Sequence, residues 1–379
     1  MKRALWLVCA LLTGALAACQ QTWVLDDLPP DAGRSGSGGT NGDGGGKGGF
    51  SPSDASMDGR CFGGQMQPIG ATADKPLVLV ALDRSSEMTG TELDGSNSSE
   101  FNEAVNDLIG QVESYAPSGQ HMNRRAIDFA YLGFPQGTTC MTPGCCASTG
   151  DLADSYSAFS AATMTCDSPA NGCGPSTDHP LAAALASASY FFEFGSGGSP
   201  AQERYVLVVT DDAPDGNCSV NMEDDCHAAQ DQVVALYGSL NVTTVVVFVG
   251  TSPNTSCFPN FVDDQGGGPP PYYGDSNLYY NAQTAQDLQE KISTAIQAMA
   301  QGACHFSLSS APSSPNDLNV SQGNTPIQPD SKNGWTYDNE SSGPRLILHG
   351  SACTTYLGSN SQFGLQVSDG CSPNHSPPP

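Results

Sequence analysis

Four short apolar runs, each followed by a stretch of helical periodicity, constrain the fold of this chain more than any other feature. The runs cover residues 76–83, 126–134, 204–212 and 242–250, and the helical stretches cover residues 99–116, 179–194, 223–240 and 281–303. Continuous apolar runs of this length are typical of strands buried on both faces of a parallel sheet. Their alternation with helices predicts an α/β fold with a doubly wound, mostly parallel sheet.

Acidic residues stand where two of these strands end. The run "PLVLVALD" ends at Asp83, and the run "RYVLVVTDD" ends with Asp211 followed by Asp212. Ligands of doubly wound sheets bind beyond the carboxyl ends of the strands. We therefore expect Asp83 and Asp211 to meet at one edge of the sheet.

The residues around these acids are rich in oxygen. Ser85 and Glu87 follow Asp83, and the loop "GPSTDHP" at residues 174–180 adds hydroxyl groups. Carboxylate and hydroxyl oxygens are the ligands of hard cations, which favours Mg²⁺ or Ca²⁺. His179 is the penultimate residue of this loop and the one histidine placed near the expected site. The other histidines are interpreted as surface or structural residues.

With these motifs in place, residues 75–303 resemble a von Willebrand factor type A domain, and the whole chain resembles the Cys-rich type A lipoproteins of gram-negative bacteria. The resemblance implies a metal-ion-dependent adhesion site with the pattern Asp-x-Ser-x-Ser, a threonine from a middle loop and a later aspartate. Asp83, Ser85 and Asp211 match that pattern. The middle-loop ligand falls on Thr177 by residue type, or on Ser176 by its spacing to Pro180.

Glu87 departs from the resemblance, because the family has serine at this position. A carboxylate here has three possible roles. It can bind the ion directly and shift the preference toward Ca²⁺, which accepts more oxygen ligands. It can fill the position that a partner's acidic group would take. It can also pair with Arg84 or another base, which would leave no metal site.

The N-terminus has the pattern of an export signal. Residues 1–18 join a basic start to an apolar stretch that ends in small residues, and Cys19 follows at once. This resembles a bacterial lipobox with Cys19 as the lipidated residue; the alternative is an ordinary cleaved signal peptide. Residues 19–60 are Gly/Ser-rich and predict a disordered tether. Gln20 after the cysteine favours sorting to the outer membrane, on its periplasmic face or at the cell surface.

Cys9 leaves with the signal and Cys19 would be lipidated, so 12 of the 14 cysteines remain, and an even number in an exported protein indicates disulfide bonds. The candidates are Cys61, Cys140, Cys145, Cys146, Cys166, Cys173, Cys218, Cys226, Cys257, Cys304, Cys353 and Cys371. Zinc is the weaker alternative, because the spacing lacks paired C-x-x-C motifs. Residues 135–175 are expected to form a Cys-rich irregular insertion, residues 304–371 a small β extension, and residues 372–379 a disordered tail.

The formal charge of -26 excludes nucleic acid as a partner and leaves the N-terminal lipid as the only membrane contact. Neither H-E-x-x-H nor G-x-S-x-G occurs, so no enzyme is expected. The sequence predicts an anchored adhesion or interaction lipoprotein that binds a protein or glycan, through a divalent cation and an acidic group of that partner. The alternative is a structural envelope protein with a degenerate metal site, which binds its partners independently of metal.

Overall fold

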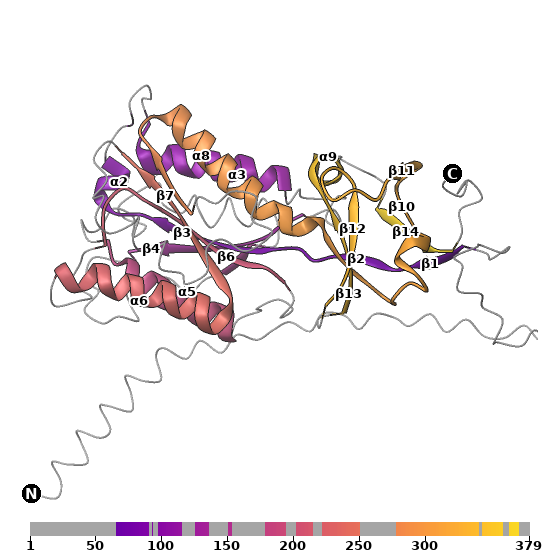
Figure 1. Ribbon diagram of the computed structural model, residues 1–379. Coiled ribbons are helices and arrows are strands. Elements are labelled where there is room, and N and C mark those ends of the chain that lie inside the picture. Colours follow the sequence, from indigo (N-terminus) through magenta and orange to yellow (C-terminus); the bar gives the residue numbers. More distant parts are fainter. Residues whose placement is uncertain are drawn as a thin grey trace, which may run out of the picture. The chain divides into compact units, whose positions relative to one another are not determined.

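The structure is a computed structural model of the 379-residue chain. It describes residues 66–90, 93, 98–115, 126–135, 151–153, 179–194, 202–214, 222–250, 278–340, 343–358 and 364–370. Figure 1 shows a set of layered helices and strands, here called the α/β region, and a set of antiparallel strands, here called the terminal β region. Within the described ranges, no helix is long and apolar enough to span a membrane.

The α/β region is built on a six-stranded sheet with the order β5-β4-β3-β6-β7-β8. Its strands are β3 (Leu77–Asp83), β4 (Asp128–Phe134), β5 (Asp151–Ala153), β6 (Arg204–Thr210), β7 (Val242–Val249) and β8 (Tyr279–Ala282). Only β5 runs antiparallel to its neighbour, and the other pairs are parallel. Every residue of β3 and β7 is buried, as expected of strands covered on both faces. The predicted α/β class with a doubly wound, mostly parallel sheet is confirmed.

Helices cover both faces of this sheet. One layer holds α3 (Glu100–Tyr115) and α8 (Ala285–Ala300), and the other holds α5 (Leu181–Phe194) and α6 (Met222–Leu240), as Figure 1 shows. The short helix α2 (Ser86–Gly90) follows β3 directly. The apolar residues of α3, including Phe101, Val105 and Leu108, are buried against the sheet, which explains their helical spacing.

Two local predictions were wrong. The helix expected from residue 281 begins at Ala285, and Tyr279–Ala282 form the edge strand β8 instead. Thr284 is extended and accepts a hydrogen bond from the Asp287 N–H, so it caps the helix and sets its start. The insertion was expected to be irregular, but its residues Asp151–Ala153 form strand β5 and pair with β4. Without β5, β4 would be an edge strand with unpaired backbone groups.

The terminal β region combines two parts of the chain that lie far apart in sequence. One sheet has the order β1-β14-β10-β11 and the other the order β12-β13-β9-β2. The strands are β1 (Gln67–Ile69), β2 (Ala71–Ala73), β9 (His305–Leu308), β10 (Leu318–Gln322), β11 (Thr325–Ile327), β12 (Trp335–Glu340), β13 (Gly343–Leu348) and β14 (Leu365–Asp369). The sequence predicted strands after residue 304 but assigned no structure to β1, β2 or the helix α9 (Gly350–Gly358). The α/β region is therefore inserted between β2 and β9.

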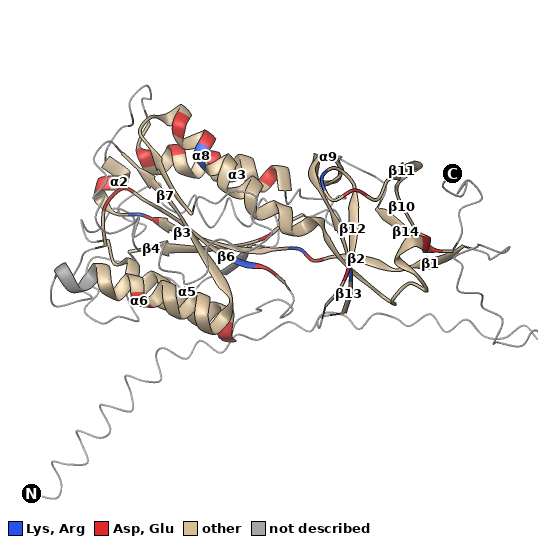
Figure 2. Ribbon diagram, in the orientation of Figure 1, with Lys and Arg blue, Asp and Glu red and all other residues tan. Residues whose placement is uncertain are grey.

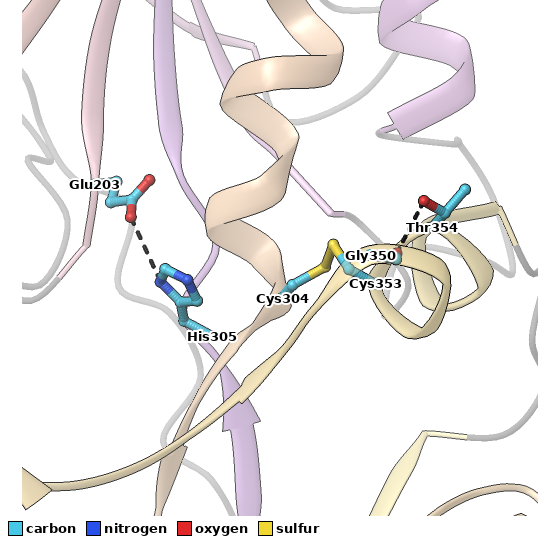
Figure 3. The surroundings of a disulfide bond; sticks show 6 residues. All are labelled: Glu203, Cys304, His305, Gly350, Cys353 and Thr354. Carbon is cyan, nitrogen blue, oxygen red and sulfur yellow. Dashed lines mark hydrogen bonds and ion pairs between the residues drawn. A yellow bond between two sulfur atoms is a disulfide. The ribbon is translucent and has the colours of Figure 1, made fainter. Parts of the chain in front are cut away.

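Both connections between the two regions meet at Glu203. Its backbone carbonyl accepts a hydrogen bond from the Leu77 N–H at 2.8 Å. Its carboxylate lies 3.5 Å from Nδ1 of His305 and accepts a 2.6 Å hydrogen bond from the Tyr205 hydroxyl. Figure 3 shows Glu203 and His305 pointing toward each other, close to the Cys304–Cys353 disulfide. This bond joins the 3-10 helix Gln301–Cys304, which follows α8, to α9.

Acidic residues dominate the charged positions of the described helices. Figure 2 shows them along α3 and α8 and at α2, close to the end of β3. Lys291 on α8 lies 3.5 Å from Asp287 in an i,i+4 pair. This distribution follows the 39 acidic against 13 basic residues of the whole sequence.

Candidate metal centre

Asp83 is the last residue of β3, and its side chain is fully buried. Its Oδ1 accepts a 2.8 Å hydrogen bond from the Ser85 N–H. Its Oδ2 accepts a 2.6 Å hydrogen bond from the Thr210 hydroxyl and lies 2.7 Å from Nδ1 of His179. A buried carboxylate needs such partners because it has lost its hydration. Asp83 is thus fixed in place by groups from three separate segments.

Ser85 is also fully buried and begins the turn into α2. Its hydroxyl oxygen accepts a 3.2 Å hydrogen bond from the Met88 N–H, which is the bond of an N-cap residue. Met88 is buried in the core and holds this turn against the sheet. The end of β3 and the start of α2 therefore form a rigid loop that presents one carboxylate and one hydroxyl.

His179 lies two residues before α5 begins at Leu181, and its side chain is 1% exposed. Its Nδ1 lies 2.7 Å from Asp83 Oδ2 and 3.6 Å from Asp211 Oδ1. The sequence placed His179 near the site only because it belongs to the 174–180 loop. Its direct contact with Asp83 had no signal in the sequence, because the contact joins positions 96 residues apart.

Asp211 follows β6, and its side chain is 8% exposed. Burial raises the pKa of Asp211 to about 8; the negative charge of Asp83 adds to this, and His179 acts in the opposite direction. Burial likewise raises the pKa of Glu100, at the start of α3, to about 7, partly offset by its hydrogen bond to Asp211. Both shifts arise mainly from burial, which disfavours the charged form of a carboxyl group.

Glu87 stands in the first turn of α2, and its side chain is 48% exposed. Its Oε2 lies 3.6 Å from Nε2 of His179. Arg84, which the sequence offered as a partner for Glu87, instead donates to the Pro135 carbonyl at 3.3 Å, beyond the end of β4. Of the roles considered for Glu87, its geometry therefore fits an ion ligand or a partner of His179 better than a pair with Arg84.

The arrangement fits a divalent cation. The ligand atoms of Asp83, His179 and Asp211 lie within 4.8 Å of one another, and so do those of Glu87, His179 and Asp212. Oδ1 of Asp211 is buried and has no hydrogen-bond partner among the described residues. A buried carboxylate oxygen in that state is satisfied when a cation is bound nearby. The donor set is mainly oxygen, with one imidazole that the resemblance does not contain.

No protein-family model matches this chain, and no curated protein matches it. Its fold is similar to solved von Willebrand type A structures. One is the type A protein from Catenulispora acidiphila, at 12% identity and a TM-score of 0.38, covering 78% of this chain and 57% of that one. Another is the type A domain of the type V pili tip protein Mfa5 from Porphyromonas gingivalis, at 11% identity and a TM-score of 0.38, covering 61% and 95%.

The chain is also similar to the pilus adhesin SpaC from Lactobacillus rhamnosus GG, at 10% identity and a TM-score of 0.41. That match covers 78% of this chain and 39% of SpaC, so the chain spans less than half of the adhesin. Likeness at these values concerns the arrangement of helices and strands and does not extend to ligands.

Several residues singled out in the sequence lie outside the described residues. They include Thr177, Ser176, the lipidation candidate Cys19 and most of the disulfide candidates. Among the described cysteines, Cys304 and Cys353 form a disulfide, and Cys226 is also disulfide-bonded. Thr210 and Glu100, which contact Asp83 and Asp211, were missed by the sequence analysis. Thr210 is adjacent to Asp211 in "VVTDD" and ends β6. Nothing in that pattern shows that its hydroxyl donates to Asp83.

Proposed function

We propose that this chain is an exported, lipid-anchored binding protein whose α/β region holds a divalent cation beyond the ends of β3 and β6. The ion would be held by Asp83, Ser85 and Asp211, with Thr177 or Ser176 completing the set. When bound, it supplies a positive charge that an acidic group of a protein or glycan partner can approach. The proposed role is adhesion or interaction and involves no catalysis.

The observation that carries this proposal is the cluster of buried carboxyl groups around His179. Asp83, Asp211 and Glu100 lie close together, and the pKa values of Asp211 and Glu100 are raised. Like charges this close are stable when a cation neutralises them. The position also agrees with the rule that ligands of doubly wound sheets bind at the carboxyl ends of the strands. Export and anchoring rest on the signal pattern, Cys19 and the described disulfides.

Cation titration of the full chain tests the proposal. After treatment with EDTA, the protein is titrated with Mg²⁺, Ca²⁺ and Mn²⁺ by calorimetry, and its thermal unfolding is followed. At an ion concentration 100-fold above Kd, binding stabilises the folded state by about 2.7 kcal/mol. Asp211→Asn should weaken binding at least about 10-fold, because it removes a charge without adding bulk. Glu113→Gln, at an exposed position of α3, is the matched control. Absence of both binding heat and a thermal shift for every cation would refute the proposal.

A second function is favoured by the 2.7 Å contact of His179 with Asp83. If this contact and the neighbouring Glu87 close the site, the chain is a structural envelope protein that binds its partners without metal. Partner capture from envelope extracts separates the two functions. Capture that EDTA abolishes supports cation-dependent binding, and capture that resists EDTA supports the structural role.

A further inference from the structure

The two ring nitrogens of His179 face different carboxyl groups. Nδ1 lies 2.7 Å from Oδ2 of Asp83, inside the sheet edge. Nε2 lies 3.6 Å from Oε2 of Glu87, whose side chain is half exposed. The imidazole thus separates a buried inner side, lined by Asp83 and Asp211, from an outer side that reaches solvent.

Asp83 orients this ring. Its position is fixed independently of His179 by the Ser85 N–H and the Thr210 hydroxyl. A carboxylate accepts hydrogen bonds and does not donate them, so the Asp83 contact places the ring proton on Nδ1. In the neutral imidazole, Nε2 then presents its lone pair to the outer side. A histidine held by a carboxylate in this way is the usual arrangement around a protein-bound zinc ion, where the carboxylate fixes the tautomer and makes the ligand nitrogen more basic.

Two carboxylates meet the outer nitrogen. The ligand atoms of Glu87, His179 and Asp212 all lie within 4.8 Å of one another. The 3.6 Å between Nε2 and the Glu87 oxygen is close to the ~3.3 Å that separates two ligands on one tetrahedral zinc ion. Asp212 is held by a 2.6 Å hydrogen bond from the Ala213 N–H to its Oδ1.

We infer that Glu87, Nε2 of His179 and Asp212 form an outer metal site for a borderline divalent ion, with Zn²⁺ as the best match. One imidazole nitrogen and two carboxylates suit Zn²⁺, whereas Mg²⁺ and Ca²⁺ take sets made of oxygen. Three protein ligands leave a fourth tetrahedral position for water or a partner's acidic group. The two carboxylates balance the charge of the ion.

An observation on the inner side of the same ring also favours a cation nearby. The buried Oδ1 of Asp211 lies 3.6 Å from Nδ1 of His179 and has no hydrogen-bond partner among the described residues. A divalent charge on the other side of the ring would stabilise this carboxylate through space. The inference rests on the proposed function, because it names the ion and the ligands through which the same edge of the sheet would bind an acidic partner. It also assigns Glu87 the role of a ligand.

Metal competition on the full chain, with its disulfides intact, tests the outer site. The metal-free protein competes with a chromophoric chelator for Zn²⁺, and Co²⁺ serves as the spectroscopic probe of coordination. Zn²⁺ should bind more than about 100-fold tighter than Mg²⁺. His179→Asn keeps an amide N–H near the position of Nδ1 but has no atom at Nε2, and should weaken Zn²⁺ binding more than about 100-fold.

Glu87→Gln keeps the inference testable if His179→Asn fails to fold, because Glu87 is on the surface. It should weaken Zn²⁺ binding about 10- to 100-fold, while Glu113→Gln should leave it unchanged. Glu87→Ser, which restores the serine of the family pattern, should shift the preference from Zn²⁺ toward Mg²⁺. Co²⁺ should show the absorption of a tetrahedral site without thiolate charge-transfer bands.

Three outcomes contradict the outer site. They are Zn²⁺ binding that is unchanged in both His179→Asn and Glu87→Gln, thiolate bands with Co²⁺, and a wild-type preference for Mg²⁺ or Ca²⁺ over Zn²⁺. A wild-type preference for Mg²⁺ or Ca²⁺ that Asp211→Asn abolishes would refute the outer zinc site. It would leave the proposed function standing. Absence of binding for every ion tested would refute both.

Discussion

The α/β region and the terminal β region reach stability in different ways. In the α/β region, parallel strands such as β3 and β7 are buried along their whole length between two helical layers. In the terminal β region, strands such as β10 and β13 are buried only in part, around a far smaller core closed by a disulfide. Strands that are buried on both faces are stabilised mainly by the burial of their apolar side chains. A small core buries less apolar surface, so a disulfide adds the stability it lacks.

This difference also concerns the chain path. The strands β1 and β2 of the terminal β region precede the α/β region in the chain, and β9 follows it, after α8 and a short 3-10 helix (Gln301–Cys304). The terminal β region is therefore complete only when residues from both sides of the insertion have met. Such long-range pairing forms slowly, because the loop must be closed before the contacts stabilise it. The α/β region contains its own core and needs no residue from β1 or β2 for it.

The largest expected effect comes from a matched pair of leucines. Leu207 on β6 and Leu346 on β13 are both fully buried. Leu→Ala in such positions costs about 2–5 kcal/mol, more where the surroundings cannot collapse into the cavity. We expect Leu207→Ala to fall near the upper end, because its strand lies between rigid neighbours β3 and β7, and Leu346→Ala near the lower end.

Two signals separate the regions in this experiment. Trp335, which is 4% exposed on β12, reports the terminal β region by its fluorescence once Trp23 has been replaced by Phe, because the exported protein proposed above loses Trp6 with the signal. Helical circular dichroism reports mainly the α/β region, which holds α3, α5, α6 and α8. Each leucine variant should shift its own signal further in a denaturant titration. Equal shifts of both signals would show that the two regions unfold as one unit.

The sequence was informative about the α/β region because its strands are continuous apolar runs. A strand lies within each of the four predicted runs, at 76–83, 126–134, 204–212 and 242–250. Asp83 and Asp211 lie close together at the ends of two of these strands. The strands β1 and β2 were not predictable, because three-residue pieces such as Ala71–Ala73 carry no periodic pattern. Their pairing depends on partners more than 200 residues away.

The sequence predicted which acidic residues line the candidate site, but it did not predict how their side chains are arranged. Asp83, Ser85 and Asp211 follow from strand ends and from the resemblance. The position of His179 between Asp83 and Glu87 depends on how α5 starts relative to β3, and no local pattern encodes that. Glu100 is equally hidden, because its role as the first residue of α3 masks its contact with Asp211.

The second prediction concerns the disulfide. Cys304 and Cys353 close a loop with a sequence separation of 49 residues. Replacing both by Ala should cost about 2–4 kcal/mol, because the unfolded chain regains the freedom that the link removes. The Trp335 signal should move to lower denaturant concentration, and the helical signal should move less. If the helical signal moves as far, the disulfide stabilises both regions and the contrast between them fails.

The smallest expected effect compares two partly buried aspartates, one in each region. Burial raises the pKa of Asp74, next to β2, but a hydrogen bond from the Ser307 hydroxyl and the charge of Arg345, 3.8 Å away, act in the opposite direction. Asp107 on α3 has no hydrogen-bond donor for its Oδ2 among the described residues. Burial raises the pKa of Asp107 to about 6, and the charge of Glu103 adds to this.

The sign of the pH dependence follows from that shift. The folded state holds the Asp107 proton more tightly than the unfolded chain, whose ordinary pKa is 3.8. The stabilisation is therefore complete at low pH and is lost as the pH rises through about 6, where the buried group must ionise. Because the side chain is partly exposed, solvent screening reduces the cost of its charge at neutral pH to about 1 kcal/mol. Asp107→Asn removes that cost.

We therefore expect Asp107→Asn to be more stable than the wild type at neutral pH by about 1 kcal/mol, and equally stable near pH ~4. Urea unfolding across this pH range measures the difference, with Glu113→Gln on the same helix as the exposed control. Asp74→Asn should gain less at neutral pH, because burial also raises the pKa of Asp74 but the Ser307 hydrogen bond and Arg345 oppose that rise. If Asp74→Asn stabilises as much as Asp107→Asn, burial alone sets the cost of these carboxylates and the partners in the terminal β region contribute nothing.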